Sequence, residues 1–283
     1  MKPKMLLLTG VFAAVATSFV AQAASADLLS EIKAKKEIVI GTEAAFPPFE
    51  FVKDGKIVGY DEDVMRDIMA GLPGVKVDQM NVPWESILPG LAAKKFDIVV
   101  TAVIETQERV EKFHFTQPLA DATVGLLVRA GDTSIKTPED ISGKIVGSEA
   151  GSGMMKVLEI YNDKLKKEGK PGAKEIKGYV SIQDAFADLA AGRISAVAQS
   201  ISSLGPLVKA RPDTFKMLPA VIGPKSYFGF VGRKGPNSDS LVNFFNDRIT
   251  QLKKSGKLKE LQMKWFGFTM DLPDVVTVPV ASK

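Results

Sequence analysis

Residues 97–118 read DIVVTAVIETQERVEKFHFTQP, and this stretch carries the main signal for the fold. It opens with the apolar run 98–100, which is typical of a short buried strand. A polar loop follows and leads to Arg109 at the start of an amphipathic run. Open α/β sheets bind ligands beyond the carboxyl ends of their strands, and a guanidinium there can bind a carboxylate through two hydrogen bonds. Arg109 is therefore a candidate carboxylate-binding residue; the alternative is a surface arginine in an ion pair at a helix start.

On both sides of this stretch, short apolar runs alternate with amphipathic ones, which predicts α/β lobes with mainly parallel sheets. Strands are expected at 37–41, 75–82, 98–100, 144–147 and 194–198. Asp61 is expected to cap a helix, and Gln199 and Ser200 to follow directly after a strand. The run 151–153, Gly-Ser-Gly, leads into a helix with Met155 facing inward, and such glycines allow free helix amides to approach an anion.

The first residues form a separate unit. Lys2 and Lys4 precede the mostly apolar run 5–20, and small residues suited to cleavage follow it. This is the layout of a secretory signal peptide, and the run is short for a membrane span. We expect residues 1–23 to be removed, with cleavage after Ala26 as a second choice; an uncleaved membrane anchor is the alternative.

Composition narrows the class of protein. The chain has 283 residues, which fits one large domain or two lobes, and its 45% hydrophobic and 25% charged residues are ordinary for a globular protein. The absence of cysteine excludes disulfides, thiolate catalysis and a lipid-modified cysteine. The formal charge is +4 and falls to +2 without the two leader lysines, so no case for nucleic acid arises. An exported chain of this kind is expected to diffuse freely in a bacterial periplasm.

A further signal comes from stretches spread along the chain. They are GTEAAFPPFEF (41–51), GYDEDV (59–64), PWESILPGLAAKKFDIV (83–99), TQER (106–109), FTQPLA (115–120), VGSEAGSG (146–153), AGRISAV (191–197) and KWFG (264–267). Each is weak alone, but their order and spacing resemble the bacterial extracellular solute-binding proteins, family 3, of polar amino-acid ABC transporters. The resemblance implies an α/β, two-lobed, periplasmic-binding-protein-like (type II) fold that closes on its ligand by a hinge motion. Lobe 1 would comprise 27–120 and 226–283, and lobe 2 would comprise 121–225, with two hinge crossovers between them.

The resemblance also implies a ligand-binding set. Its members are Glu43, Phe46, Trp84, Ala102, Ile104, Arg109, Glu149, Ser152, Gly153 and Ser200. Phe46 and Trp84 resemble the aromatic pair that encloses the ligand's side chain, with plain core packing as the alternative. Arg109 resembles the arginine that clamps the α-carboxylate, assisted by amides near Ala102 and at 152–153. Glu43 falls where an acidic residue often faces the ligand.

Two positions depart from the family pattern. Ile104 stands where a Ser or Thr is usual, and Ser200 stands where an Asp usually pairs with the α-ammonium. Losing a charge-assisted hydrogen bond can cost about 1.5–3 kcal/mol, so the ligand is expected either to hold its ammonium differently or to lack one. Glu43 and Glu149 should face the cleft from opposite lobes, which favours a cationic or polar amino acid. In the alternative, Glu149 points to solvent and pairs with Lys144.

The resulting hypothesis is a periplasmic substrate-binding component of an ABC importer. It would be a monomer without cofactor, metal or enzymatic activity, with a small-molecule ligand and an inner-membrane permease as partners. A periplasmic enzyme of the same fold, such as a cyclohexadienyl or arogenate dehydratase, is the alternative, with Glu43 and Glu149 as acid and base. His114, the only histidine, lies in an alternating strand and is expected at the surface or between lobes. A sensor module of a receptor is the third alternative.

Overall fold

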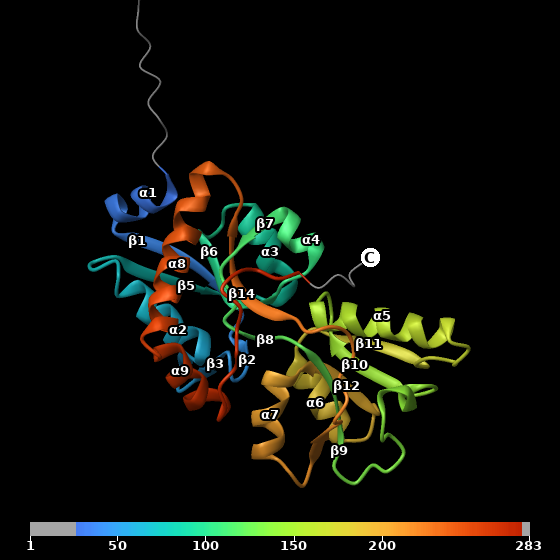
Figure 1. Ribbon diagram of the computed structural model, residues 1–283. Coiled ribbons are helices and arrows are strands. Elements are labelled where there is room, and N and C mark those ends of the chain that lie inside the picture. Colours follow the sequence, from blue (N-terminus) through green and yellow to red (C-terminus); the bar gives the residue numbers. More distant parts are fainter. Residues whose placement is uncertain (1–26, 279–283) are drawn as a thin grey trace, which may run out of the picture.

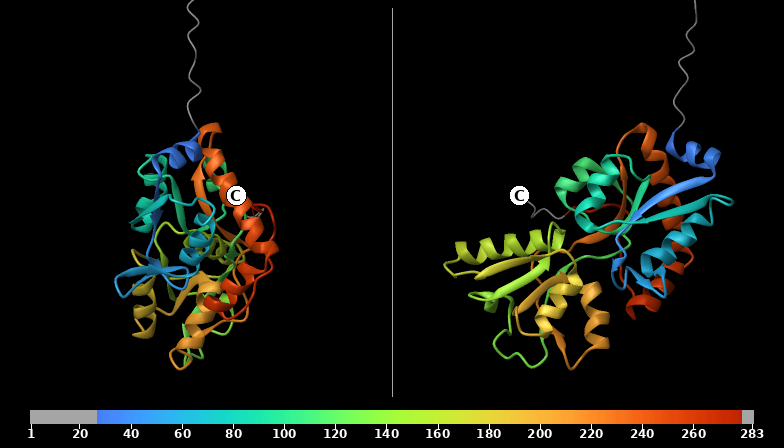
Figure 2. Two further views of the ribbon diagram at one scale, coloured as in Figure 1. Left: turned by 90° about the vertical axis from the view of Figure 1, so that its left-hand side faces the viewer. Right: turned by 180° about the vertical axis from the view of Figure 1, so that it is seen from behind.

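The computed structural model describes residues 27–278, and the predicted signal peptide lies outside this range. Figure 1 shows two lobes, and Figure 2 shows them from the side and from behind. Each lobe is built around its own β-sheet, with helices packed on the sheet. The chain passes from lobe 1 to lobe 2 after β8 (Ala120–Asp121) and returns before β14 (Tyr227–Arg233).

The sheet of lobe 1 surrounds the strand that the sequence marked most clearly. Its spatial order is β5 (Lys76–Asn81), β1 (Glu37–Thr42), β6 (Ile98–Ile104), β14 and β7 (Phe113–Phe115), and β8 pairs with β14. All seven residues of β6 are buried. Because side chains alternate along a strand, Ile98 and Val100 pack into the larger core while Val99 and Val103 pack into a smaller one on the other face. The polar loop after β6 therefore begins from a rigid support.

Helices and a small three-stranded sheet complete lobe 1. The helices are α1 (Leu28–Lys35), α2 (Tyr60–Met69), α3 (Trp84–Ala92), α4 (Gln107–Lys112), α8 (Pro236–Lys254) and α9 (Lys257–Phe266). The small sheet consists of β2 (Ala45–Phe46), β3 (Glu50–Lys53) and β4 (Lys56–Val58). The prediction that Asp61 caps α2 is wrong, because the helix begins one residue earlier with Gly59 as its N-cap. Asp61 instead lies buried in the first turn.

Lobe 2 has the same layered design. Its sheet runs β11 (Glu175–Tyr179), β10 (Ile145–Glu149), β12 (Ala196–Ser200), β9 (Val124–Arg129) and β13 (Phe215–Met217). Its helices are the 3₁₀-helix η1 (Pro138–Ile141), α5 (Gly153–Lys167), α6 (Ile182–Ala190) and α7 (Ile201–Ala210). In α5 the first turn buries Met154, whereas Met155, the predicted inward residue, is half-buried.

Both sheets are mixed, which corrects the expectation of mainly parallel sheets. β1 pairs in parallel with β5 and β6, but β14 runs antiparallel to β6, β7 and β8. In lobe 2, β10 pairs in parallel with β11 and β12, while β9 runs antiparallel to β12 and β13. The strands that connect the lobes, β9 and β14, supply much of the antiparallel pairing. Within residues 27–278, no helix is long and apolar enough to cross a membrane.

Candidate functional site

One small cavity between the lobes collects nearly the whole predicted ligand-binding set. It is lined by Glu43, Phe46, Trp84, Ala102, Ile104, Arg109, Glu149, Ser152, Gly153 and Met154. Most of these residues come from the carboxyl ends of β1, β6 and β10 or from the segments that follow them, while Phe46 lies in β2 and Trp84 begins α3, which follows β5. The cavity measures only about 10 Å³, which is close to the space of one water molecule. The two lobes are therefore closed on each other in this structure.

Arg109 sits at the contact between the lobes. Thr106 caps α4 by accepting a hydrogen bond from the Arg109 N–H at 3.3 Å. The guanidinium donates to the Ile104 carbonyl at 3.3 Å and, across the lobes, to the Gly151 carbonyl at 3.2 Å. It also lies 5.0 Å from the centroid of the Trp84 ring, a cation–π distance.

Within residues 27–278, the charge of Arg109 has no carboxylate within ion-pair distance. Glu108, the nearby acid that acts on it, pairs with Lys112 at 2.8 Å instead. Desolvation lowers the pKa of Arg109 to about 10, because burial disfavours the charged form. A guanidinium remains charged at this pKa under neutral conditions. Its hydrogen-bond partners are neutral carbonyl oxygens, so the guanidinium is suited to bind an anion.

Glu43 and Glu149 form a carboxyl pair across the lobes. Their side chains are 5% and 4% exposed and are hydrogen-bonded to each other. Burial, followed by repulsion from Glu149, raises the pKa of Glu43 to about 9. Burial also raises the pKa of Glu149 to about 7, although its hydrogen bonds with Glu43 and with the Ile182 N–H favour its charged form. The pair therefore holds one proton near neutrality, with Glu43 donating to an ionised Glu149.

This geometry differs from the alternative in which Glu149 points to solvent. The carboxylate of Glu149 lies at the start of α6, where the free amides and the helix dipole favour a negative charge. The Coulombic influence of Glu85 opposes it. The two cleft carboxyl groups are thus held by hydrogen bonds rather than by Lys144.

The two aromatic residues face the cavity and also belong to the cores. Phe46 stacks on Phe49 at a centroid distance of 5.1 Å and meets Phe228 edge-on at 6.2 Å. Trp84 packs in the smaller core with Ile87, next to β6. Both side chains therefore line the cavity and also pack in a hydrophobic core, and the packing holds their rings in place.

Ile104 and Gly153 lie in close contact across the lobes. A Cβ atom placed on Gly153 would lie 1.8 Å from Cγ2 of Ile104, far inside van der Waals contact. Ser152 caps α5 by accepting the Met155 N–H at 3.1 Å. The first turn of α5 is therefore covered by an aliphatic side chain at the position where family members usually carry a hydroxyl.

Ser200 is the one predicted residue that does not line the cavity. It is fully buried as the N-cap of α7, where its Oγ accepts the Ser203 N–H and the Ser202 hydroxyl, both at 3.3 Å. It is the last residue of β12, at the strand end expected from the sequence. Nearby, Ser203 Oγ donates to the Pro47 carbonyl at 3.2 Å and links the lobes. The expected contact of Ser200 with a ligand stays a prediction.

Sequence reasoning missed Met154 and a second acid pair. Glu50 and Asp61 are 1% and 2% exposed and are hydrogen-bonded to each other, and Thr101 donates to Glu50. Burial raises the pKa of Asp61 to about 7 and that of Glu50 well above its usual range. Nothing in the sequence signals this pair, because its members lie on different elements. The Gly-Ser-Gly turn is a local signal that pointed to the region of Met154.

His114 lies on the surface of lobe 1, away from this cavity. Its Nδ1 hydrogen-bonds Asp239 Oδ1 at 2.7 Å, and its side chain is 30% exposed. This is one of the two locations expected from the sequence, and it gives the histidine a structural partner on α8.

Residues 38–268 match the model of the bacterial extracellular solute-binding proteins, family 3. The chain belongs to this family. The solute-binding protein is 30% identical over 264 residues to the L-cystine-binding protein TcyJ of Escherichia coli K12, covering 92% of this chain and 94% of that relative. An ancestral arginine-binding protein bound to arginine has 32% identity and a TM-score of 0.71, covering 82% of this chain and 99% of that one.

A third comparison concerns the ancestral amino acid-binding protein AncCDT-1, described as a precursor of cyclohexadienyl dehydratase. It has 30% identity and a TM-score of 0.70, covering 85% of this chain and 100% of that one. The matches extend over most of this chain and nearly all of each relative, and they agree with the two-lobed architecture. The solute-binding protein is the amino-acid-binding component of an ABC transporter.

Proposed function

We propose that Arg109 binds the α-carboxylate of an amino acid in the cleft and that Glu43 and Glu149 receive its positive charge. The observation that supports this assignment is a desolvated guanidinium whose hydrogen bonds within residues 27–278 go to carbonyl oxygens and which lines the same cavity as a buried carboxyl pair. Buried charges need partners of opposite sign. A zwitterion supplies an anion to Arg109 and a cation to the pair in one molecule.

The lobes would close by rotation near Ala120 and Ser226. β8 pairs with β14 beside these residues, so the two chain crossings lie next to each other and form one hinge region. A ligand that contacts both lobes stabilises the closed form by its greater affinity for that form. The cavity of about 10 Å³ cannot hold an amino acid, so the lobes must open to admit a ligand before they close around it.

The ligand preferred by this cleft would be cationic or polar. Arg109 contributes one positive charge, and the Glu43–Glu149 pair contributes one negative charge while it holds its shared proton. The rings of Phe46 and Trp84 would enclose the stem of the ligand and attract a cation. Arginine and cystine, the ligands named for two relatives, are therefore the first candidates.

The proposed function also includes a cellular location, an oligomeric state and a membrane partner. Residues 1–23 would direct the chain to the periplasm, where it would act as a monomer without a cofactor, metal or catalytic step. The closed, loaded form would deliver its amino acid to an inner-membrane permease. Support comes from the signal-like sequence at the N-terminus and from membership of an extracellular solute-binding family.

The test is a thermal-shift screen of residues 24–283 against amino acids, amines and organic acids, followed by titration calorimetry. A ligand present at 100 times its dissociation constant should add about 2.7 kcal/mol of stability. Binding of one amino acid per chain supports the proposal. A dicarboxylate as the tightest ligand would contradict the charge preference, and the absence of any amino-acid ligand would contradict the function.

An enzymatic role is the second candidate, because a protonated Glu43 beside an ionised Glu149 is an acid–base pair with separated pKa values. The similar protein AncCDT-1 is itself an amino acid-binding protein but is described as a precursor of cyclohexadienyl dehydratase, which is the reason to test this role. Incubation with prephenate and arogenate separates the two roles. Stoichiometric binding of an amino acid without product supports the binding protein, whereas catalytic product formation supports the dehydratase.

A further inference from the structure

The second pair of buried carboxyl groups lies where the loop 43–49 meets the start of α2. Glu50 of β3 and Asp61 of α2 are hydrogen-bonded to each other. Thr101 of β6 donates its hydroxyl to Glu50, and the next residue along the strand, Ala102, lines the cleft cavity. The pair therefore joins three elements of lobe 1 next to the wall of the cleft.

The backbone also fastens the loop 43–49 to α2 at this junction. Tyr60 and Asp61 each donate a backbone N–H to a carbonyl of the loop, at 2.9 Å in both bonds. Gly59 permits this close approach, because a Cβ atom at that position would lie 2.0 Å from the Phe49 carbonyl oxygen. The loop and the first turn of α2 are therefore in direct contact through both backbone and side chains.

Two residues of the cleft depend on this junction. Glu43 and Phe46 belong to the loop, and both line the cavity. Phe46 pairs with Glu50 between β2 and β3, and its ring stacks on Phe49 at 5.1 Å. A shift of Glu50 would therefore displace the ring that faces the cleft.

The two carboxyl groups can stay together only while they hold a proton. Apart from the bond between them, Glu50 Oε2 and Asp61 Oδ2 are buried without a hydrogen-bond partner among residues 27–278. Two ionised carboxylates side by side would repel each other strongly, because burial removes the screening by water. A shared proton turns this repulsion into a hydrogen bond.

The charged groups around the pair do not favour its full ionisation. Glu43 after β1 and Glu62 on α2 act on it as further negative charges. The hydroxyl of Tyr60 donates to a backbone carbonyl at 2.7 Å instead. On α9, Lys264 is paired with Asp63 at 2.6 Å. The shared proton is therefore the group that holds the two acids together.

We propose that Glu50 and Asp61 are positioning residues for the ligand, and that the proton they share fastens the loop 43–49 to α2. Loss of this proton would drive the two carboxylates apart and move Glu43 and Phe46 out of their places in the cleft. The inference rests on the proposed function, in which these two residues contact the ligand. The state of the loop, however, can be measured without any ligand.

The test follows amide hydrogen exchange at Tyr60 and Asp61 in the ligand-free protein, since these N–H groups bind the loop. In Glu50→Gln, the side-chain oxygen still accepts from Thr101 and the amide N–H donates to Asp61, so the junction needs no shared proton. Glu50→Ala removes both bonds and should speed exchange at least about tenfold at pH 5. Glu50→Gln should stay within about twofold of the unaltered protein at this pH.

The dependence on pH separates a shared proton from a purely structural role. Burial raises the pKa of Asp61 to about 7 and that of Glu50 well above its usual range. The pair therefore stabilises the junction below the ordinary carboxyl range, and this stability is lost as the pH rises through the raised values. Because opening releases a proton, exchange in the unaltered protein relative to Glu50→Gln should grow at least about tenfold between pH 5 and pH 8. The intrinsic effect of pH on exchange cancels in this ratio.

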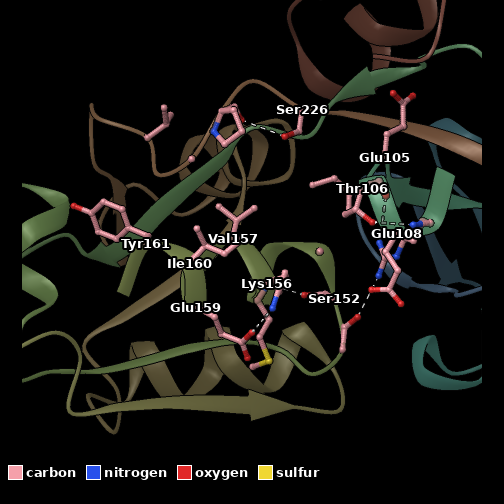
Figure 3. A pocket seen from close by; sticks show the side chains of 18 of the residues that line it. Glu105, Thr106, Glu108, Ser152, Lys156, Val157, Glu159, Ile160, Tyr161 and Ser226 are labelled. Atoms are coloured by element: carbon pink, nitrogen blue, oxygen red, sulfur yellow. Dashed lines mark hydrogen bonds and ion pairs between the residues drawn. The ribbon is translucent and has the colours of Figure 1, made fainter. Parts of the chain in front are cut away.

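Glu105 provides a matched control. It is another buried acid of lobe 1, and burial raises its pKa to about 8. Figure 3 shows Glu105 beside Thr106 at a separate cavity of about 690 Å³, and it accepts the Thr277 N–H at 3.1 Å. Glu105→Gln should therefore leave exchange at the two amides within about twofold at every pH.

Titration calorimetry at pH 7 tests the consequence for binding, with L-arginine as the first probe and L-cystine as the second. Glu50→Ala should bind the amino acid at least about tenfold more weakly, because ordering the loop again costs binding free energy. Glu50→Gln should keep the affinity of the unaltered protein within about twofold, since its junction remains intact.

Equally fast exchange in Glu50→Gln and Glu50→Ala, or a ratio that stays constant from pH 5 to pH 8, would overturn the inference. If Glu50→Ala does not fold, the pH dependence of the ratio for Glu50→Gln decides it alone. Exchange as expected with unchanged affinity in Glu50→Ala would overturn the positioning role. Exchange as expected in a protein that binds no amino acid would support the shared proton and contradict the proposed function.

Discussion

Gly153→Ala should weaken ligand binding by blocking closure of the lobes. The added Cβ would lie 1.8 Å from Ile104 Cγ2, whereas carbon atoms in contact are about 3.5–4.0 Å apart. The lobes would have to separate by more than about 1 Å, unless Ile104 finds another rotamer. The Arg109–Gly151 hydrogen bond, already 3.2 Å long, would then exceed hydrogen-bonding distance.

The size of this effect follows from the cost of overpacking. Forcing a methyl group into a filled interior costs about 1–3 kcal/mol, which corresponds to a roughly 5- to 150-fold loss of affinity. The clash destabilises the closed form and leaves the open form unaffected. Within lobe 2 the change replaces a glycine at the start of α5 by a better helix former, so thermal stability of the ligand-free protein should stay level or rise.

The assay is titration calorimetry with the ligand found in the screen, together with small-angle scattering of the free protein. Gly153→Ala should bind more weakly and show a larger radius of gyration. Ile104→Ala introduced into the same chain removes the obstructing methyl groups and should restore much of the affinity. Unchanged affinity in Gly153→Ala, or no recovery in the double variant, would refute the claim that contact between these two residues limits closure of the lobes.

Three further results are expected. Arg109→Ala should cost about 3 kcal/mol or more in binding by calorimetry, because a desolvated ligand carboxylate loses its partner, while an unchanged dissociation constant would remove Arg109 from the site. Closure of the ligand-free lobes should take up a proton, since the closed form raises the pKa of Glu43 from 4.5 to about 9. Closure is then strongest below pH 4.5 and weakens as the pH rises towards 9, by up to about 1.4 kcal/mol per unit. Scattering that shows the same radius across this window would contradict the shared proton, and Glu43→Gln should remove most of the dependence. Sequencing of exported protein should begin after Ala23 or Ala26, and an intact Met1 would refute signal cleavage.

Much of the site was predictable from the sequence because each contributing loop follows a recognisable strand. The apolar run before Arg109 marks β6, and the turn at 151–153 marks the start of α5. Parallel strands end at one edge of a sheet, so residues just past their ends converge without any further information. Glu43 directly follows β1, Glu149 is the last residue of β10, and Arg109 lies in α4 after β6, so strand positions together with the family resemblance located them.

Ser200 and Asp61 show where local patterns fall short. Ser200 follows the same rule of position, yet its hydroxyl is taken by the first turn of α7. Asp61 has the composition of a helix cap, but Gly59 ends the preceding turn and Asp61 is drawn inside to meet Glu50. Ser200 could have contacted a ligand or capped a helix, and Asp61 could have capped a helix or been buried beside another acid. In both cases the tertiary structure decided between the two roles.

By itself, the amino-acid sequence indicated most of the helices and strands and the family, and it predicted an export signal and the residues of the cleft. These depend on periodicity, turns and spacing, which act over short distances along the chain. The tertiary structure alone decided the antiparallel strands β9 and β14, the proton shared by Glu43 and Glu149, and the contact of Ile104 with Gly153. Those features join residues from different lobes or from distant strands, and burial changes the energy of a charge only after the lobes have closed around it.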